Sequence, residues 1–148
     1  MNGANSIVLY VEDEETDRFL MERAFAKEGL QAVLRMVEHG RAAIEYLSGD
    51  GAYARREEHP LPGVMLLDLN LPEVHGFEVL KWIRAHPVHA GLPVVVFTSS
   101  ERPEDRERAA LLGANEYWQK PGSPALLREV ARKLHDRWLC AGRLESAA

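Results

Sequence analysis

The sequence lacks the features that would place the protein in a membrane or outside the cell. Its single cysteine, Cys140, cannot form an internal disulfide, and its first residues have neither the basic nor the apolar segment of a signal peptide. The longest apolar runs, such as residues 94–97, are far shorter than the ~20 residues that span a bilayer. We therefore expect a cytoplasmic protein with no membrane segment.

The sequence also has no surplus of basic residues. Its 18 Lys and Arg stand against 23 Asp and Glu, which gives a formal net charge of −5. A nucleic-acid binder usually carries a clustered basic excess that neutralises phosphates, so we predict no direct contact with nucleic acid. There is no glycine-rich Walker loop and no Gly-x-Ser-x-Gly motif, and the six histidines show no metal-ligand spacing. We interpret the histidines as surface residues.

What is present is enough apolar material for one folded domain. The chain has 148 residues, of which 46% are hydrophobic and 28% are charged, a balance typical of a globular protein. We expect a single domain over residues 1–148 with a core at about 6–139. This length predicts no separate output domain.

Strand-length apolar runs alternate with segments of helical spacing. The predicted strands are Ile7–Val11, Val33–Val37, Val64–Leu67, Val94–Phe97 and a weaker one around Glu116–Trp118. The predicted helices are Thr16–Glu28, Arg41–Ser48, Phe77–Ala85, Pro103–Leu112 and Ser123–Leu139. Continuous apolar strands are typical of parallel strands buried on both faces. The fold class is therefore α/β, a doubly wound sheet of five βα units in a three-layer sandwich.

Acidic, hydroxyl and amine side chains follow four of the predicted strands. Ligands of such sheets bind beyond the carboxyl ends of the strands, so these groups are expected to converge there although they are far apart in sequence. They are Glu12 and Asp13, Asp68, Thr98, and Lys120. Carboxylates that share a pocket repel one another unless a cation is present, and Mg²⁺ prefers such oxygen ligands. We predict a magnesium site formed by Glu12, Asp13 and Asp68.

A carboxylate can also act as the nucleophile in phosphoryl transfer and form an aspartyl phosphate. Asp68 is the best-placed acceptor because it directly follows four apolar strand residues. Transfer of this kind depends on positioning and on neutralising the phosphoryl oxygens, which Mg²⁺ and Lys120 would share. Thr98 could donate a hydrogen bond to a third oxygen.

Four motifs in order resemble those of the receiver domain of two-component response regulators: VEDEETDRFL, LLDLNLPEVHGFEVL, VVVFTSS and GANEYWQKP. The resemblance covers nearly the whole chain and implies a flavodoxin-like sheet with strand order 2-1-3-4-5. It implies that Asp68 is the phosphoacceptor, with Thr98 and Lys120 binding the phosphoryl group. It further implies Mg²⁺ ligation by Glu12, Asp13, Asp68 and the carbonyl of Asn70. Thr98 and Tyr117 would be the switch residues, although Tyr117 is equally consistent with a half-buried strand residue.

The sequence departs from the usual receiver pattern in several places. Glu12 replaces the commoner Asp, and His75 stands in a tight turn where a residue that tolerates positive φ is expected. Gly122–Ser123 replaces the usual pair after Lys120–Pro121, whose peptide bond the family resemblance predicts to be cis. The loop at 49–63 is long, and this loop, the DLNLP string and Trp138 together most resemble the stand-alone regulators associated with bacterial phytochromes.

The sequence therefore predicts a phosphoacceptor response regulator, a signalling protein and not an enzyme in the usual sense. Its expected partners are a sensor histidine kinase, of phytochrome type by the narrower resemblance, and a downstream protein or a second copy of itself. One alternative is a receiver-like interaction module that is never phosphorylated. Another is a metal-dependent phosphatase, which typically has a second Asp two positions after its nucleophile, where this chain has Asn70.

Overall fold

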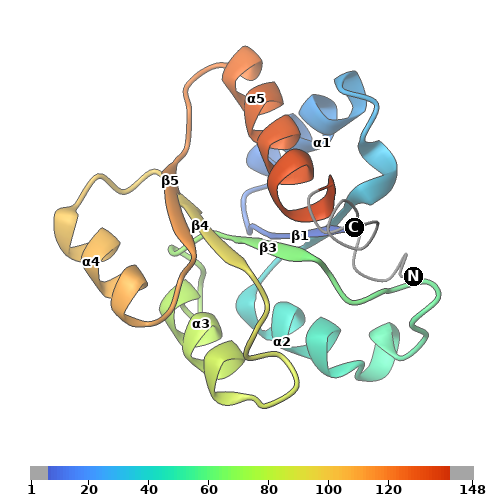
Figure 1. The fold of residues 1–148 in the computed structure, drawn as a ribbon, viewed down its shortest axis with the longest axis vertical. Helices are drawn as coiled ribbons and strands as arrows, with labels where there is room; N and C mark the ends of the chain where they lie inside the picture. The colour runs from blue at the N-terminus through green and yellow to red at the C-terminus, as the bar shows by residue number, and fades with distance from the viewer. Residues whose placement is uncertain (1–6, 141–148) are drawn as a thin grey trace.

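The computed structural model describes residues 7–140, and its centre is a five-stranded parallel sheet (Figure 1). The strands are β1 (Val8–Val11), β2 (Leu34–Val37), β3 (Val64–Leu67), β4 (Val94–Thr98) and β5 (Glu116–Gln119). Their spatial order is β2-β1-β3-β4-β5, which confirms the predicted flavodoxin-like topology. The chain leaves β1 toward β2 and returns on its other side to β3, so the switch in strand order lies between β1 and β3.

Within residues 7–140, five α-helices cover the two faces of the sheet (Figure 1). They are α1 (Glu15–Lys27), α2 (Gly40–Ser48), α3 (Gly76–Ala85), α4 (Pro103–Leu111) and α5 (Pro124–Leu134). Helices α1 and α5 pack together on one face, while α2, α3 and α4 lie on the other. The predicted three-layer sandwich is confirmed.

Successive strand residues supply the two cores because side chains alternate across a strand. In β1, Leu9 and Val11 pack toward α2 and α3, whereas Val8 and Tyr10 pack toward α1 and α5. All four are buried, which explains why the sequence of β1 is continuously apolar.

Several element ends differ from the sequence-based boundaries. A 3₁₀ turn at Gln31–Val33 precedes β2, and α5 ends at Leu134 before a π-helical turn at His135–Cys140. Helix α1 begins one residue earlier than predicted, after Glu14, which makes no side-chain capping bond. The side chain of Cys140 and residue 6 lie outside the described part of the chain.

The long loop between α2 and β3 is held by one arginine. Arg56 donates hydrogen bonds to the carbonyls of Tyr46 (2.8 Å), Leu47 (2.7 Å) and His59 (3.1 Å). The first two carbonyls belong to the last turn of α2, where backbone acceptors have no partner within the helix. The loop therefore caps α2, and it contains a 3₁₀ turn at Gly51–Tyr53.

The interpretation of all six histidines as surface residues is wrong for His89, which is buried and stacks on Trp82 at 5.8 Å between ring centroids. An uncharged imidazole ring is planar and packs against another aromatic ring with little loss of solvation free energy. His39 and His75 have structural roles, since their Nδ1 atoms accept hydrogen bonds from Ala42 N and Phe77 N at the starts of α2 and α3.

The turn before α3 also differs from the prediction. His75 has a φ of −63°, so it does not need the left-handed conformation, because it serves as the N-cap of α3 in an extended conformation. The positive φ, 63°, lies two residues earlier at Glu73. Among the described residues, no helix is both long and apolar enough to cross a membrane.

Candidate functional site

The carboxyl ends of β1, β3 and β5 bring the predicted acidic and amine groups together. The ammonium of Lys120 lies 2.7 Å from Glu12 Oε1 and 3.3 Å from Asp68 Oδ2. These residues are 108 and 52 positions from Lys120 in the sequence. Parallel strands end at the same edge of the sheet, and the register of β1 with β3 places Val11 beside Leu67, directly before the two acids.

The turn from β1 into α1 fixes Glu12. Its carboxylate accepts a hydrogen bond from the backbone N–H of Glu14 at 3.1 Å, and its carbonyl accepts one from Arg18 at 2.9 Å. The hydroxyl of Tyr10 donates to Glu12 Oε1 at 3.0 Å. Tyr10 lies two residues before Glu12, so both side chains are directed to the same side of the strand.

Glu12 is fully buried, and this burial disfavours the charged form of its carboxyl group. Burial, together with the negative charge of Asp68, raises its pKa to about 7 even though the hydrogen bond from Lys120 acts in the opposite direction. Burial likewise raises the pKa of the Tyr10 hydroxyl, and the neighbouring Glu12 raises it further. Tyr10 therefore acts as a hydrogen-bond donor to Glu12.

A third carboxylate also holds Lys120. Asp17, in the first turn of α1, lies 2.9 Å from the ammonium through Oδ2. Burial alone would lower the pKa of Lys120, but the hydrogen bonds from its ammonium to Glu12 and Asp17 outweigh burial and raise the pKa. Lys120 is thus a permanent cation surrounded by three acids.

Asp68 ends β3 in a closely packed turn. It is 4% exposed, and its Oδ1 accepts a hydrogen bond from the backbone N–H of Asn70 at 3.4 Å. The start of α3 lies directly against this turn, because a Cβ at Gly76 would overlap the carbonyl oxygen of Asp68. Glycine at this position lets α3 approach the strand end and keeps the Asp68 backbone in place.

Thr98 and Tyr117 lie beside this pocket. Thr98 is fully buried at the end of β4, and its Oγ1 accepts a hydrogen bond from Ser100 N at 3.3 Å. The hydroxyl of Tyr117 donates to the carbonyl of Ser100 at 3.1 Å, so the two residues predicted to form the switch hold the same loop. The guanidinium of Arg106 in α4 lies over the Tyr117 ring, 4.6 Å from its centroid. Half-buried and bonded to the loop, Tyr117 links β5 to the segment that follows Thr98.

The acidic part of the pocket fits a divalent cation. Glu12, Asp13 and Asp68 each offer a carboxylate oxygen, and these oxygens lie within 4.8 Å of one another. Two of the three acids are buried, and burying several carboxylates together is unfavourable without a cation. Oxygen donors are the ligands that Mg²⁺ and Mn²⁺ prefer.

Two features of the site differ from the sequence-based prediction. Tyr10 and Asp17 were not predicted, although the alternation of β1 places Tyr10 on the side of Glu12 and the start of α1 places Asp17 near the strand end. The predicted cis bond at Lys120–Pro121 is wrong, since the described residues contain no cis peptide bond. The trans form of an X–Pro bond is favoured by about 0.5–1 kcal/mol, and here Lys120 reaches all three acids from a trans backbone.

A doubly wound fold with buried acids, a cation and a hydroxyl at the ends of its central strands can hold a divalent cation together with a phosphoryl group, the arrangement expected of a receiver domain. The chain belongs to the response regulator receiver domain family, whose model matches residues 8–132.

Two-component response regulators are also the relatives that the chain resembles in sequence and structure. Response regulator Rcp1 of Synechocystis is 32% identical over 133 residues, a match that covers 90% of this chain and 88% of Rcp1. The structure of Rcp1 in its Mn²⁺-bound form superposes with a TM-score of 0.77, covering 90% of this chain and 94% of that one.

Two further solved structures are regulators from light signalling. The phosphorylated cyanobacterial phytochrome response regulator RcpA is 31% identical, with a TM-score of 0.80 over 91% of this chain and 94% of that one. Response regulator RPA3017 in red light signalling of R. palustris is 32% identical, with a TM-score of 0.83 over 90% of this chain and 93% of that one. The resemblance to phytochrome-associated regulators is therefore confirmed.

Proposed function

We propose that the protein is the phosphoacceptor of a two-component phosphorelay and that Asp68 accepts the phosphoryl group. The observation that carries the proposal is the setting of this carboxylate. It is buried at the end of a central strand, 3.3 Å from the Lys120 ammonium, and it shares a pocket with the carboxylates of Glu12 and Asp13.

In the proposed transfer, a carboxylate oxygen of Asp68 attacks the phosphorus of a phosphohistidine. The new P–O bond forms as the P–N bond breaks, and the imidazole nitrogen leaves with the electron pair and takes up a proton from solvent. With acetyl phosphate as donor, a P–O bond breaks instead and acetate leaves. Glu12, Asp13, Asp68 and the carbonyl of Asn70 would hold Mg²⁺, which supplies charge neutralisation at the phosphoryl oxygens.

The chain's own residues then bind and sense the phosphoryl group. Lys120 would neutralise one phosphoryl oxygen. The hydroxyl of Thr98, which accepts a hydrogen bond from Ser100 N, would shift toward another phosphoryl oxygen and donate a hydrogen bond to it. This change pulls on the loop that Tyr117 holds through the Ser100 carbonyl. The surface formed by that loop, α4 and β5 is the proposed output, read by a partner protein or a second copy of the chain.

The proposed donor is a sensor histidine kinase. Two of the similar structures are described as regulators of phytochrome or red light signalling, which favours a phytochrome-type kinase for this chain as well. We further propose that the chain acts through its receiver domain, a unit for which the match to Rcp1 extends over most of that relative's length.

The test is incubation with Mg²⁺ and acetyl phosphate followed by intact-mass measurement. The native chain should gain the mass of one phosphoryl group and Asp68→Asn should not, whereas the matched control Asp50→Asn, an exposed acid in a distant loop, should gain it like the native chain. If no chain gains mass at saturating donor, the protein is an interaction module of receiver fold. Turnover of a small phosphate ester would instead indicate a phosphatase.

A further inference from the structure

All three N–H donors of the Lys120 ammonium are engaged by carboxylates. They contact Glu12 Oε1 at 2.7 Å, Asp17 Oδ2 at 2.9 Å and Asp68 Oδ2 at 3.3 Å. An ammonium has three donors and no more, so a phosphoryl oxygen on Asp68 has to displace an existing acceptor or share a donor with it. The availability of the Lys120 ammonium to a phosphoryl oxygen depends on which carboxylate is displaced.

The three carboxylates differ in how easily water can replace Lys120. The side chain of Glu12 is fully buried and that of Asp68 is 6% exposed, whereas that of Asp17 is 37% exposed. A buried carboxylate that loses its cation retains an uncompensated charge, but an exposed one is rehydrated. Glu12 is in addition held by Tyr10 and by the Glu14 N–H, so its position is fixed. Asp17 is the partner that can be exchanged.

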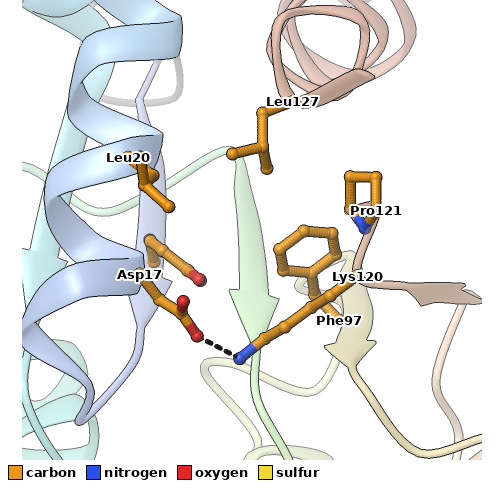
Figure 2. A pocket seen from close by; sticks show the side chains of 7 residues that line it. Asp17, Leu20, Phe97, Lys120, Pro121 and Leu127 are labelled. Carbon is orange, nitrogen blue, oxygen red and sulfur yellow. Dashed lines mark hydrogen bonds and ion pairs between the residues drawn. The ribbon is translucent and has the colours of Figure 1, made fainter. Parts of the chain in front are cut away.

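The space around Lys120 permits such an exchange. Figure 2 shows its side chain reaching across from the end of β5 to Asp17 on α1, below Leu20 and Leu127. A small cavity of about 50 Å³ lies along this side chain, between α1 and the start of α5. The aliphatic part of Lys120 is therefore not tightly enclosed on this side.

We infer that Asp17 is a positioning residue that restrains Lys120 in the resting site and is exchanged for a phosphoryl oxygen when Asp68 is modified. This inference rests on the proposed function of Asp68. Asp17 thereby slows the phosphorylation of Asp68, because the ion pair between Asp17 and Lys120 has to break before the ammonium is fully available. Asp17 itself does not contact the reacting atoms; it acts through Lys120.

The test compares the rate of Asp68 phosphorylation by acetyl phosphate, followed by intact mass, in three variants and the native chain. Asp17→Asn keeps the shape of the side chain and removes the charged partner of Lys120. It should accelerate phosphorylation by about threefold to fivefold, the factor that corresponds to a partly exposed ion pair. Asp17→Glu keeps the charge and should restore a rate close to the native one.

The matched control is Glu15→Gln, which removes one negative charge from the same first turn of α1 at an exposed residue that forms no ion pair with Lys120. Loss of charge alone speeds reaction with an anionic donor, but that effect should fade when salt shortens the screening length to ~4 Å. We expect the advantage of Asp17→Asn over Glu15→Gln to persist at high salt.

Two results would overturn the inference, and they are distinguishable. If the native chain is phosphorylated but Asp17→Asn reacts no faster than Glu15→Gln at high salt, Asp17 does not restrain Lys120, while Asp68 remains the acceptor. If the native chain gains no phosphoryl mass at all, the proposed function of Asp68 fails and the inference falls with it. The proportion of folded protein, measured by circular dichroism, should be the same in all four chains.

Discussion

Lys120 and Arg84 are partly buried cations at opposite edges of the sheet, and they bind different kinds of acceptor. At the carboxyl edge, Lys120 is bonded to the side chains of three acids. At the amino edge, Arg84 from the last turn of α3 donates to the backbone carbonyls of Gly113 (2.9 Å), Ala90 (3.1 Å) and Leu92 (2.8 Å), and to the side chain of Asn115 (3.0 Å).

This difference separates a reactive site from a structural brace. Backbone carbonyls are fixed by the chain, so the planar guanidinium of Arg84 ties the α3–β4 and α4–β5 loops in one arrangement. Asn115 extends the brace, because its Oδ1 also accepts from the N–H of Val94 at 2.8 Å. The carboxylates around Lys120 belong to separate side chains, and the exposed one, Asp17, can be exchanged for another acceptor. The polar contacts of Arg84 therefore stabilise the amino edge, whereas those of Lys120 leave the carboxyl edge available for chemistry.

The largest expected effect on stability comes from breaking the brace. Arg84→Met removes donors from four acceptors and should lower the free energy of unfolding by about 3 kcal/mol. Urea denaturation measures this change. Arg84→Lys keeps the positive charge but loses the planar, forked set of N–H donors. Its free energy of unfolding should therefore lie between those of the native chain and Arg84→Met. The folded variants should still be phosphorylated on Asp68; loss of phosphorylation would mean that the two edges are not separate.

At the opposite edge, the change should affect binding more than stability. Asp13→Asn should weaken Mg²⁺ binding by about tenfold, which corresponds to ~1.4 kcal/mol, because it removes one of the proposed charged ligands. Without metal its stability should be unchanged or slightly higher, since repulsion among the acids is relieved. Calorimetric titration with Mg²⁺ measures the affinity, and Glu14→Gln, an exposed neighbour, is the charge-matched control. Equal affinities in the two variants would contradict the assignment of Asp13.

A smaller effect is expected at the loop between the reactive edge and the surface. Tyr117→Phe removes the hydroxyl that donates to the Ser100 carbonyl and should lower stability by about 1 kcal/mol. Arg106→Gln removes the cation over the Tyr117 ring and should lower stability by about 0.5 kcal/mol. Denaturation of the two single variants and the double variant tests whether they act together. If Tyr117→Phe leaves stability unchanged, Tyr117 does not hold the loop.

The smallest expected effect is a pH dependence at the amino edge. Burial lowers the pKa of His89 from its ordinary 6.5, and the neighbouring His86 and Arg56 lower it further. The unfolded chain then binds this proton more readily than the folded chain, so His89 reduces stability as the pH falls through about 6.5 toward the lowered value. His89→Gln should make the free energy of unfolding less dependent on pH in this range. The change should be smaller than the loss of stability expected for Arg84→Met. Parallel curves for the native chain and the variant would show that His89 is not titrating in this way.

Most of the fold could be predicted because its signals are local. Continuous apolar runs indicate strands buried on both faces, and Pro103 and Gly113 correctly mark the two ends of the α4 region. The residues at the strand ends were predictable for a related reason. Once parallel strands are assigned, Glu12, Asp68 and Lys120 have to lie at one edge, and the structure brings Glu12 and Asp68 each within hydrogen-bond distance of Lys120.

Contacts that depend on packing between elements could not be predicted in this way. Asp17 looks like any acid in the first turn of a helix, where it suits the helix dipole, and nothing local indicates that it contacts Lys120, 103 residues away. His89 lies in a loop segment broken by prolines, and its burial depends on the ring of Trp82. The partners of Arg84 come from two other loops.

The sequence by itself thus determined the order of strands and helices, the acidic edge and the family. Hydrophobic patterns, strand ends and motifs are all local features of the sequence. Only the tertiary structure decided which acids share Lys120, which of them is exposed enough to release it, and which histidine is buried. Those properties depend on distances between side chains from different elements, and such distances are fixed when α1, α5 and the strands pack against one another.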